Sequence, residues 1–311
     1  MCETDVKISV LMPNYNDSEY LPRALESVLP LQMYLYEFVI CDDASTDNSW
    51  EILLEYQKKY PIIKLIRNEK NLGFAGNLNR LFKEASGDYI LIAAADDELI
   101  IENTEILLKK IHEQPEPEIA MFCAKVIYYY EKMDAYSWES SQVKSGVYSD
   151  ILSNIRRHLP WAGFAIYKKD VFTSLWEKVM PMDFWFDLVS QLIIAQYHTI
   201  YYLNQPAGKF RYSEDNISWE AQTRKYQWQA LPKLFTLLQN DYPELYKSMV
   251  SSKLFCHFFG VPQYIICHPR MWNRDTWNIV FSALSDKVTY APYIPDFLLK
   301  IWRKIRYRKS I

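Results

Sequence analysis

The sequence predicts an α/β protein with a mostly parallel sheet, helices on both of its faces, and a helical C-terminal region. Within the first hundred residues, short apolar segments alternate with amphipathic segments three times, and a fourth apolar segment follows. The connections are short, as is usual for a parallel sheet built from strand–helix units. Half of the 311 residues are hydrophobic, so a large core can form. We expect one domain over residues 1–215 and a helical region over residues 216–311.

The first elements follow from apolar periodicity. Strands are expected over residues 8–12, 37–41 and 62–66, with a fourth that begins at Tyr89. A first helix is expected after Ser18, with Leu21, Leu25, Val28 and Leu29 on its buried face, and two more are expected over residues 49–59 and 74–85. Ser18 is the expected N-cap of the first helix, and Pro22 is tolerated in its first turn.

The pattern is weaker after Glu98. We expect helices over residues 104–112 and 188–196, and strands over 120–130, 161–167 and 200–203. The polar segment 132–147 is expected to be a loop, and residues 213–218 are expected to close the first domain. From Trp219 onward the sequence is helical and aromatic in character.

Composition excludes several classes of function. A net charge of −3 offers no general basis for nucleic-acid binding. The five cysteines are odd in number and contain no C-x-x-C pair, which argues against a disulfide framework and a zinc site and favours a reducing compartment. The acidic N-terminus does not resemble a signal peptide, and no apolar run has the length of a transmembrane helix.

Polar residues follow three of the expected strands at the point where each strand ends. They are Asn14-Tyr15-Asn16, Asp42-Asp43 and Asp96-Asp97. Ligands of open α/β sheets bind at this edge. An aromatic ring, a hydrogen-bond acceptor and a pair of acids that hold a divalent cation are the parts needed to bind a nucleotide diphosphate. Neither G-x-G-x-x-G nor G-x-x-x-x-G-K-[ST] is present, which points away from dehydrogenases and P-loop ATPases.

These segments resemble the motifs of family 2 glycosyltransferases, which have the GT-A fold. The resemblance covers roughly residues 6 to 212 and rests on four motifs in the family's order and spacing. They are Ile8–Asn16, Val39–Asp47, Asn71-Leu72-Gly73 with Asn77, and Gly87–Asp97.

The resemblance implies a role for each matching residue. Pro13 and Tyr15 fall where the family packs uracil, and Asp43, with Asp42 beside it, where the family accepts the base N–H. Asp96 and Asp97 fall where the family contacts the ribose and a metal, Mg²⁺ or Mn²⁺. Which of the two acids touches the ion stays open. The matching cofactor-binding residues also include Asn71, Gly73 and Asn77.

Four positions depart from the family pattern. Ala94 replaces the first acid of D-A-D-D, and Gly76 replaces an arginine that could help hold the diphosphate. Phe186 replaces the glutamate of an E-D pair, and Ser213 replaces a histidine that in some relatives helps bind the metal or diphosphate.

The resemblance also implies a catalytic base. The family places it about 19 residues before a proline that Pro206 matches, and this spacing leads to Asp187, with Asp183 as the fallback. A carboxylate there would deprotonate the acceptor hydroxyl in an inverting transfer. The alternative is an ordinary aspartate in the first turn of a helix.

The last residues combine an apolar stripe with basic residues over 297–309. This pattern is typical of an amphipathic helix on an anionic membrane surface, although a basic tail packed on the domain is the alternative. We therefore expect a cytoplasmic enzyme, peripheral on the inner membrane.

We interpret the chain as an inverting, UDP-sugar-dependent glycosyltransferase whose acceptor is a bacterial surface glycan or a polyprenyl-linked oligosaccharide. The alternatives are a nucleotidyltransferase and a catalytically degenerate binding module. The sugar, the linkage and the oligomeric state are not identified by the sequence.

Overall fold

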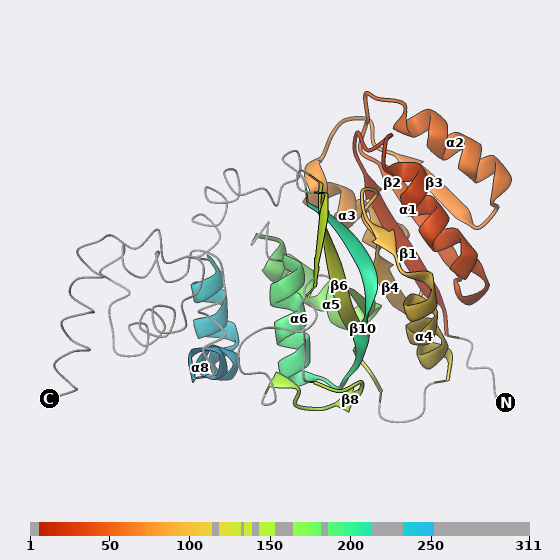
Figure 1. The fold of residues 1–311 in the computed structure, drawn as a ribbon. Helices are drawn as coiled ribbons and strands as arrows, with labels where there is room; N and C mark the ends of the chain where they lie inside the picture. The colour runs from red at the N-terminus through yellow and green to blue at the C-terminus, as the bar shows by residue number, and fades with distance from the viewer. Residues whose placement is uncertain are drawn as a thin grey trace, which may run out of the picture. The chain divides into compact units, whose positions relative to one another are not determined.

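A mixed β-sheet forms the centre of the first of two compact units in this computed structural model (Figure 1). The structure describes residues 6–113, 118–131, 134–138, 143–152, 164–181, 186–212 and 233–251. The described residues up to 212 belong to the first unit, and residues 233–251 belong to the second.

Four parallel strands form one half of the sheet, in the order β3-β2-β1-β4. Their bounds are β1 Ile8–Asn14, β2 Glu37–Asp42, β3 Ile63–Arg67 and β4 Tyr89–Ile92. The connecting helices are α1 Leu21–Val28, followed by the 3₁₀ helix η1 Leu29–Tyr34, then α2 Ser49–Lys59 and α3 Gly73–Glu84. The four predicted strands and three helices are confirmed. Because these strands run in one direction, their carboxyl ends lie at one edge of the sheet.

Burial explains the apolar character of this half. Every residue of β1 is buried, as is every residue of β2 after Glu37. Strands covered on both faces have no solvent side and are continuously apolar. The predicted face of α1 is buried as well, including Leu21, Leu25 and Val28. Each such side chain contributes about 1.5–3 kcal/mol relative to an exposed one.

The second half of the sheet is mixed. Strand β9 (Ala165–Lys168) lies between β4 and β6 and is antiparallel to both. Strand β6 (Met121–Tyr130) is parallel to β10 (Ile200–Tyr212), so both end at the same edge as β1 and β4. The antiparallel edge strands are β5 Glu98–Leu99, β7 Ala135–Trp138 and β8 Gly146–Tyr148. The helices of this half are α4 Ile101–His112, α5 Lys169–Val179 and α6 Phe186–Tyr197.

Helix α6 begins at the carboxyl edge of the sheet. It ends at Tyr197, just before β10 starts at Ile200, and β10 then runs to the carboxyl edge (Figure 1). The ring of Phe186, in its first turn, lies 5.6 Å from the ring of Phe74. Phe74 belongs to the first turn of α3, which follows β3 at that same edge. The start of α6 is thereby placed beside the strand-end loops.

Several expected elements differ from the structure. Segment 132–147 is not simply a loop, because its described residues include β7 and the start of β8. Strand β10 does not stop at Leu203 but continues to Tyr212, with register shifts around Pro206. Helix α4 starts at Ile101 rather than at 104, and α5 was not expected. Ser18 does not cap α1, which begins after Tyr20 without a side-chain cap.

The second unit is helical where it is described. Residues 233–241 are helical, and α8 spans Pro243–Ser251. No helix among the described residues is long and apolar enough to cross a membrane. The basic amphipathic segment 297–309, the fallback base Asp183 and the substituted position Ser213 lie outside the described residues.

Candidate active site

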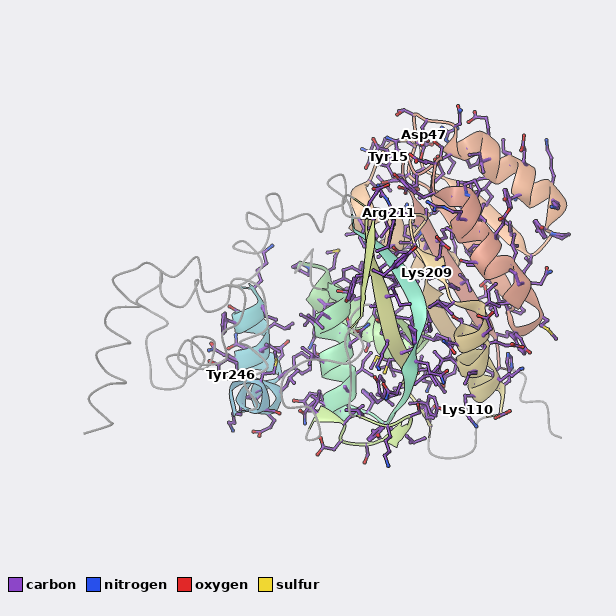
Figure 2. The ribbon with its side chains drawn as sticks, viewed as in Figure 1. Tyr15, Asp47, Lys110, Lys209, Arg211 and Tyr246 are labelled. Atoms are coloured by element: carbon purple, nitrogen blue, oxygen red, sulfur yellow. The ribbon has the colours of Figure 1, made fainter. Side chains whose placement is uncertain are left out.

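The predicted site residues gather at the carboxyl edge of the sheet, in the loops that follow β1, β2 and β4. Figure 2 shows Tyr15, Asp47 and Arg211 towards this end of the first unit, whereas Lys110 lies at the opposite end. Because β1 pairs in parallel with both β2 and β4, the loops that follow these three strands lie side by side, although they are far apart in sequence.

Asp42 is held by a network of protein groups. Asn14 Nδ2 donates to Asp42 Oδ1 at 2.8 Å and to Ser45 Oγ at 3.2 Å. Arg67 Nε lies 3.2 Å from Asp42 Oδ2, and the Ser45 backbone N–H donates to that oxygen at 3.1 Å. Because Asp42 is fully buried, Arg67 compensates a charge that would otherwise be expensive to enclose. This arrangement indicates that Asp42 is part of the scaffold of the site.

The loop after β1 is tied to the loop after β2 and leaves an aromatic ring in solvent. Asn16 adopts a positive φ of 58°, and its Oδ1 accepts the Thr46 backbone N–H at 2.8 Å. Tyr15 is 44% exposed, whereas Pro13 is buried within β1. Tyr15 is therefore available to stack on a flat ligand, and Pro13 lies behind the surface.

Asp43 anchors the loop before α3. Its Oδ1 accepts the side-chain amide of Asn68 at 2.8 Å and the Leu72 backbone N–H at 2.9 Å. In the same loop the Gly73 backbone N–H donates to Asn71 Oδ1 at 2.7 Å, and Gly73 has a φ of +73°, which glycine adopts without strain.

Asn77, another predicted binding residue, is buried. Its Nδ2 donates to the Cys41 carbonyl at 2.9 Å. This bond fastens α3 to β2, directly behind the strand end that carries Asp42 and Asp43. The geometry supports a structural contribution to the site from Asn77.

Asp96 and Asp97 lie beside Arg211 of β10. Arg211 Nη1 is 3.7 Å from Asp96 Oδ2, and the Arg211 backbone N–H donates to Asp97 Oδ1 at 2.9 Å. Burial, together with the neighbouring Asp96 carboxylate, holds the pKa of Asp97 well above its usual range. Burial also raises the pKa of Asp96, an effect that Arg211 opposes. Sequence reasoning did not single out Arg211, although it belongs to the segment matched to the family pattern around Pro206.

Asp17 is a further acid that sequence reasoning missed. Burial, followed by repulsion from Asp96, raises the pKa of Asp17 to about 7. The Asp17 carboxylate in turn contributes to the raised pKa of Asp97. The signal in the sequence was weak, because a lone aspartate after Asn14-Tyr15-Asn16 is also an ordinary turn residue. Asp17, Asp96 and Asp97 therefore repel one another, and a bound cation would relieve this repulsion.

Asp187 is partly buried in the first turn of α6. Its Oδ1 accepts the backbone N–H of Leu188 at 2.7 Å, and burial raises the pKa of Asp187 to about 6. The adjacent Phe186 packs against Phe74 and, edge to face, against Trp176 at 5.2 Å. A carboxylate with a pKa near 6 is ionised at neutral pH and is more basic than an ordinary aspartate, which suits a general base.

A divalent metal at this edge would have few protein ligands. Among the residues that the structure describes, no group of three or more His, Cys, Asp or Glu side chains is arranged to hold a metal. Mg²⁺, however, commonly takes one or two carboxylates and completes its shell with water and substrate phosphates. Asp96 fits such a site because its side chain is 21% exposed and the acids Asp17 and Asp97, besides Arg211, interact with it electrostatically. Asp97 fits less well, because its Oδ1 already accepts the Arg211 backbone N–H.

The parallel half-sheet with acidic loops at its carboxyl edge has the arrangement of the GT-A glycosyltransferase fold. The model of the family described as "Glycosyl transferase family 2" matches residues 9–176. The chain belongs to this family.

Relatives match this chain over different lengths. The uncharacterized glycosyltransferase YibD of Escherichia coli K12 is 24% identical over 97% of this chain and 95% of its own length. WfgD of Escherichia coli, named a UDP-Glc:α-D-GlcNAc-diphosphoundecaprenol β-1,3-glucosyltransferase, is 35% identical over 33% of this chain and 40% of its length. Other curated relatives match at 40–42% identity, and the chain spans about a quarter to a third of their length.

The fold has a counterpart among solved structures. A crystal structure of S. aureus TarS in complex with UDP-GlcNAc superposes with a TM-score of 0.55 and 16% identity. The match covers 90% of this chain and 91% of that one. At this identity the likeness establishes the fold alone.

Proposed function

We propose that this enzyme transfers a sugar from a UDP-sugar to a hydroxyl of a glycan or lipid-linked acceptor, with inversion at the anomeric carbon. The observation that carries the proposal is the partly buried Asp187, with its raised pKa, at the same edge of the sheet as Asp96 and Arg211. A base, an acid suited to a metal and a cation at one edge of the sheet would supply the groups that displacement of a diphosphate requires.

UDP is the proposed donor nucleotide. The exposed Tyr15 ring can stack on uracil. Asp43 is the proposed acceptor of the base N–H, because it occupies the matching position of the family motif. Each carboxylate oxygen has two lone pairs, so Asp43 can accept this bond beside those from Asn68 and Leu72. The TarS crystals that contain UDP and UDP-GlcNAc lend support, since they share the fold.

Asp96 is the proposed ligand of Mg²⁺ or Mn²⁺. When bound, such a cation would stabilise the negative charge on the departing diphosphate. Arg211 provides a second positive charge beside Asp96, at an edge where Gly76 replaces the arginine common in the family. Asp97 orients the end of β10 through the Arg211 backbone N–H.

Asp187 is the proposed base. Its carboxylate would take the proton of the acceptor hydroxyl as that oxygen forms a bond to the anomeric carbon. The bond between the anomeric carbon and the diphosphate breaks at the same time, and UDP leaves from the opposite face. A single displacement of this kind inverts the anomeric centre.

The acceptor is proposed more broadly. The printed name of WfgD describes an acceptor on a diphosphoundecaprenol carrier, which supports a glycan or polyprenyl-linked acceptor in bacterial surface-polysaccharide synthesis. The basic segment 297–309 would hold the enzyme at the cytoplasmic face of the membrane where such carriers are used. Deletion of residues 297–311 should then abolish sedimentation with anionic liposomes, and unchanged sedimentation would contradict this part of the proposal.

UDP binding by titration calorimetry tests the division of roles. We expect Asp96→Asn to remove the gain in UDP affinity that Mn²⁺ provides, and Asp187→Asn to retain it while sugar transfer is lost. Asp88→Asn is the matched control, because Asp88 precedes the same strand β4 at its opposite end and accepts the Lys7 backbone N–H. Equal Mn²⁺-dependent binding in Asp96→Asn and the control would contradict the assignment of the metal ligand.

A further inference from the structure

The Arg211 side chain is held by two residues, Tyr20 and Glu131, for which the sequence predicts no role in the site. Arg211 Nη2 donates to the Tyr20 hydroxyl at 2.7 Å and to Glu131 Oε2 at 2.9 Å. The guanidinium carbon lies 3.7 Å from the centre of the Tyr20 ring. We call Tyr20, Glu131 and Arg211 the guanidinium clamp.

The clamp joins three distant parts of the chain. Tyr20 comes from the turn between β1 and α1, Glu131 follows the last residue of β6, and Arg211 lies near the end of β10. The Tyr20 hydroxyl also donates to Glu131 Oε1 at 3.4 Å, so the two anchors contact each other. The Arg211 side chain is 9% exposed, which limits the positions that its guanidinium can take.

The geometry divides the guanidinium into an anchored nitrogen and a nitrogen that faces the acids. Tyr20 and Glu131 both accept from Nη2, whereas Nη1 faces Asp96 Oδ2 at 3.7 Å. A cation bound by Asp96 would repel the guanidinium and weaken its attraction to that carboxylate. Arg211 then needs anchors other than Asp96 to stay beside a bound diphosphate, and Tyr20 and Glu131 are such anchors.

We propose that Tyr20 and Glu131 are positioning residues that hold the Arg211 guanidinium against the donor diphosphate while Asp96 binds the metal. This inference rests on the proposed UDP-sugar function. The Tyr20 ring beneath the guanidinium carbon and the two hydrogen bonds to Nη2 together restrict the position of the guanidinium. The diphosphate, rather than the nucleoside, is the part of the donor that this arrangement recognises.

The test compares the affinities for UDP and UMP in the presence of Mn²⁺. We expect Glu131→Ala to weaken UDP binding roughly five- to twentyfold, the range for loss of a hydrogen bond to a charged group that acts indirectly. UMP has one phosphate fewer, so its affinity should change by less than about twofold, since the base and ribose contacts are untouched. Tyr20→Leu should act in the same direction.

Conservative variants separate positioning from folding. Glu131→Gln keeps an acceptor for Nη2 and should recover much of the UDP affinity, and Tyr20→Phe, which keeps the ring, should bind UDP more tightly than Tyr20→Leu. Tyr56→Phe is a control that removes a hydroxyl bonded to Glu26 at 3.1 Å on the surface of α2. It should leave both affinities unchanged.

Two results would overturn the inference. One is a ratio of UDP to UMP affinity that stays at the wild-type value in Glu131→Ala and Tyr20→Leu. The other is an equal loss of UDP and UMP binding, which would indicate a general disturbance of the site. If wild-type protein binds no UDP at all, the proposed function fails, and the inference that rests on it fails too.

Discussion

Replacing Asp187 by asparagine should abolish transfer and at the same time stabilise the fold at neutral pH. Burial raises the pKa of Asp187 from the ordinary value of 3.8 to about 6. This difference corresponds to about 3 kcal/mol of destabilisation when the carboxylate is ionised in the folded state. Because part of the side chain reaches solvent and asparagine must satisfy its own amide, we expect a measured gain of about 1–2 kcal/mol.

The gain should depend on pH in a defined direction. Between about pH 4 and pH 6 the folded protein binds more protons at Asp187 than the unfolded chain does, so its stability falls as pH rises through this window. Below the window Asp187 is neutral in both states, and the difference between wild type and variant should approach zero. Above pH 6 the difference should reach its full value and stay constant.

Urea unfolding of both proteins at pH 4.0, 5.0 and 7.5, pH values chosen to span roughly this window, measures the effect. Asp170→Asn is the matched control, because Asp170 also lies in the first turn of a helix and accepts the backbone N–H of the next residue at 2.7 Å. Its side chain is 70% exposed, so its neutralisation should give no comparable gain. A pH-independent difference for Asp187→Asn, or a variant less stable than wild type at pH 7.5, would refute the reasoning.

Three further outcomes follow from the site. The kcat/KM of transfer should rise with pH and reach half its maximum near the pKa of about 6 that burial gives Asp187, which a pH–rate profile measures; a flat profile across pH 5–7 would contradict it. Asn77→Ala should lower the free energy of unfolding by about 1–2 kcal/mol through loss of the bond to Cys41, while UDP affinity in calorimetry stays close to wild type. Arg67→Ala should destabilise by about 2–3 kcal/mol in urea unfolding, because buried Asp42 loses its partner, and a change below ~0.5 kcal/mol would show that this pair is not needed.

The parallel half of the sheet was predictable because local and tertiary preferences agree there. Strands β1 and β2 are continuously apolar and buried, and Leu21, Leu25 and Val28 repeat at helical spacing on the buried face of α1. The pattern of apolar residues in the sequence therefore predicts which residues of these elements are buried.

The second half was harder to predict because its strands depend on their neighbours. The sequence Asn204–Gly208 is typical of a turn, yet β10 passes through it with irregular register around Pro206. Such irregularities let a strand accommodate proline and glycine. Strands β7 and β8 have only four and three residues, too few to show an alternating pattern, and they form by pairing with β6 and β10.

The same distinction applies to the site. Asp42, Asp43, Asp96 and Asp97 directly follow predicted parallel strands. Because such strands end at one edge of the sheet, the sequence alone predicts that these acids lie together. Arg211 could not be placed beside Asp96 in this way, because its position depends on the unexpected length of β10.

Metal-dependent release of UDP from a UDP-sugar tests the central claim most directly. A panel of UDP-, GDP- and dTDP-sugars would be incubated with the protein and Mn²⁺, with and without EDTA, and the nucleotide diphosphate released would be quantified. We expect release of UDP from a UDP-sugar, suppression by EDTA, and loss in both Asp96→Asn and Asp187→Asn. Undiminished release in EDTA, or preference for a GDP- or dTDP-sugar, would contradict the donor site proposed at this edge of the sheet.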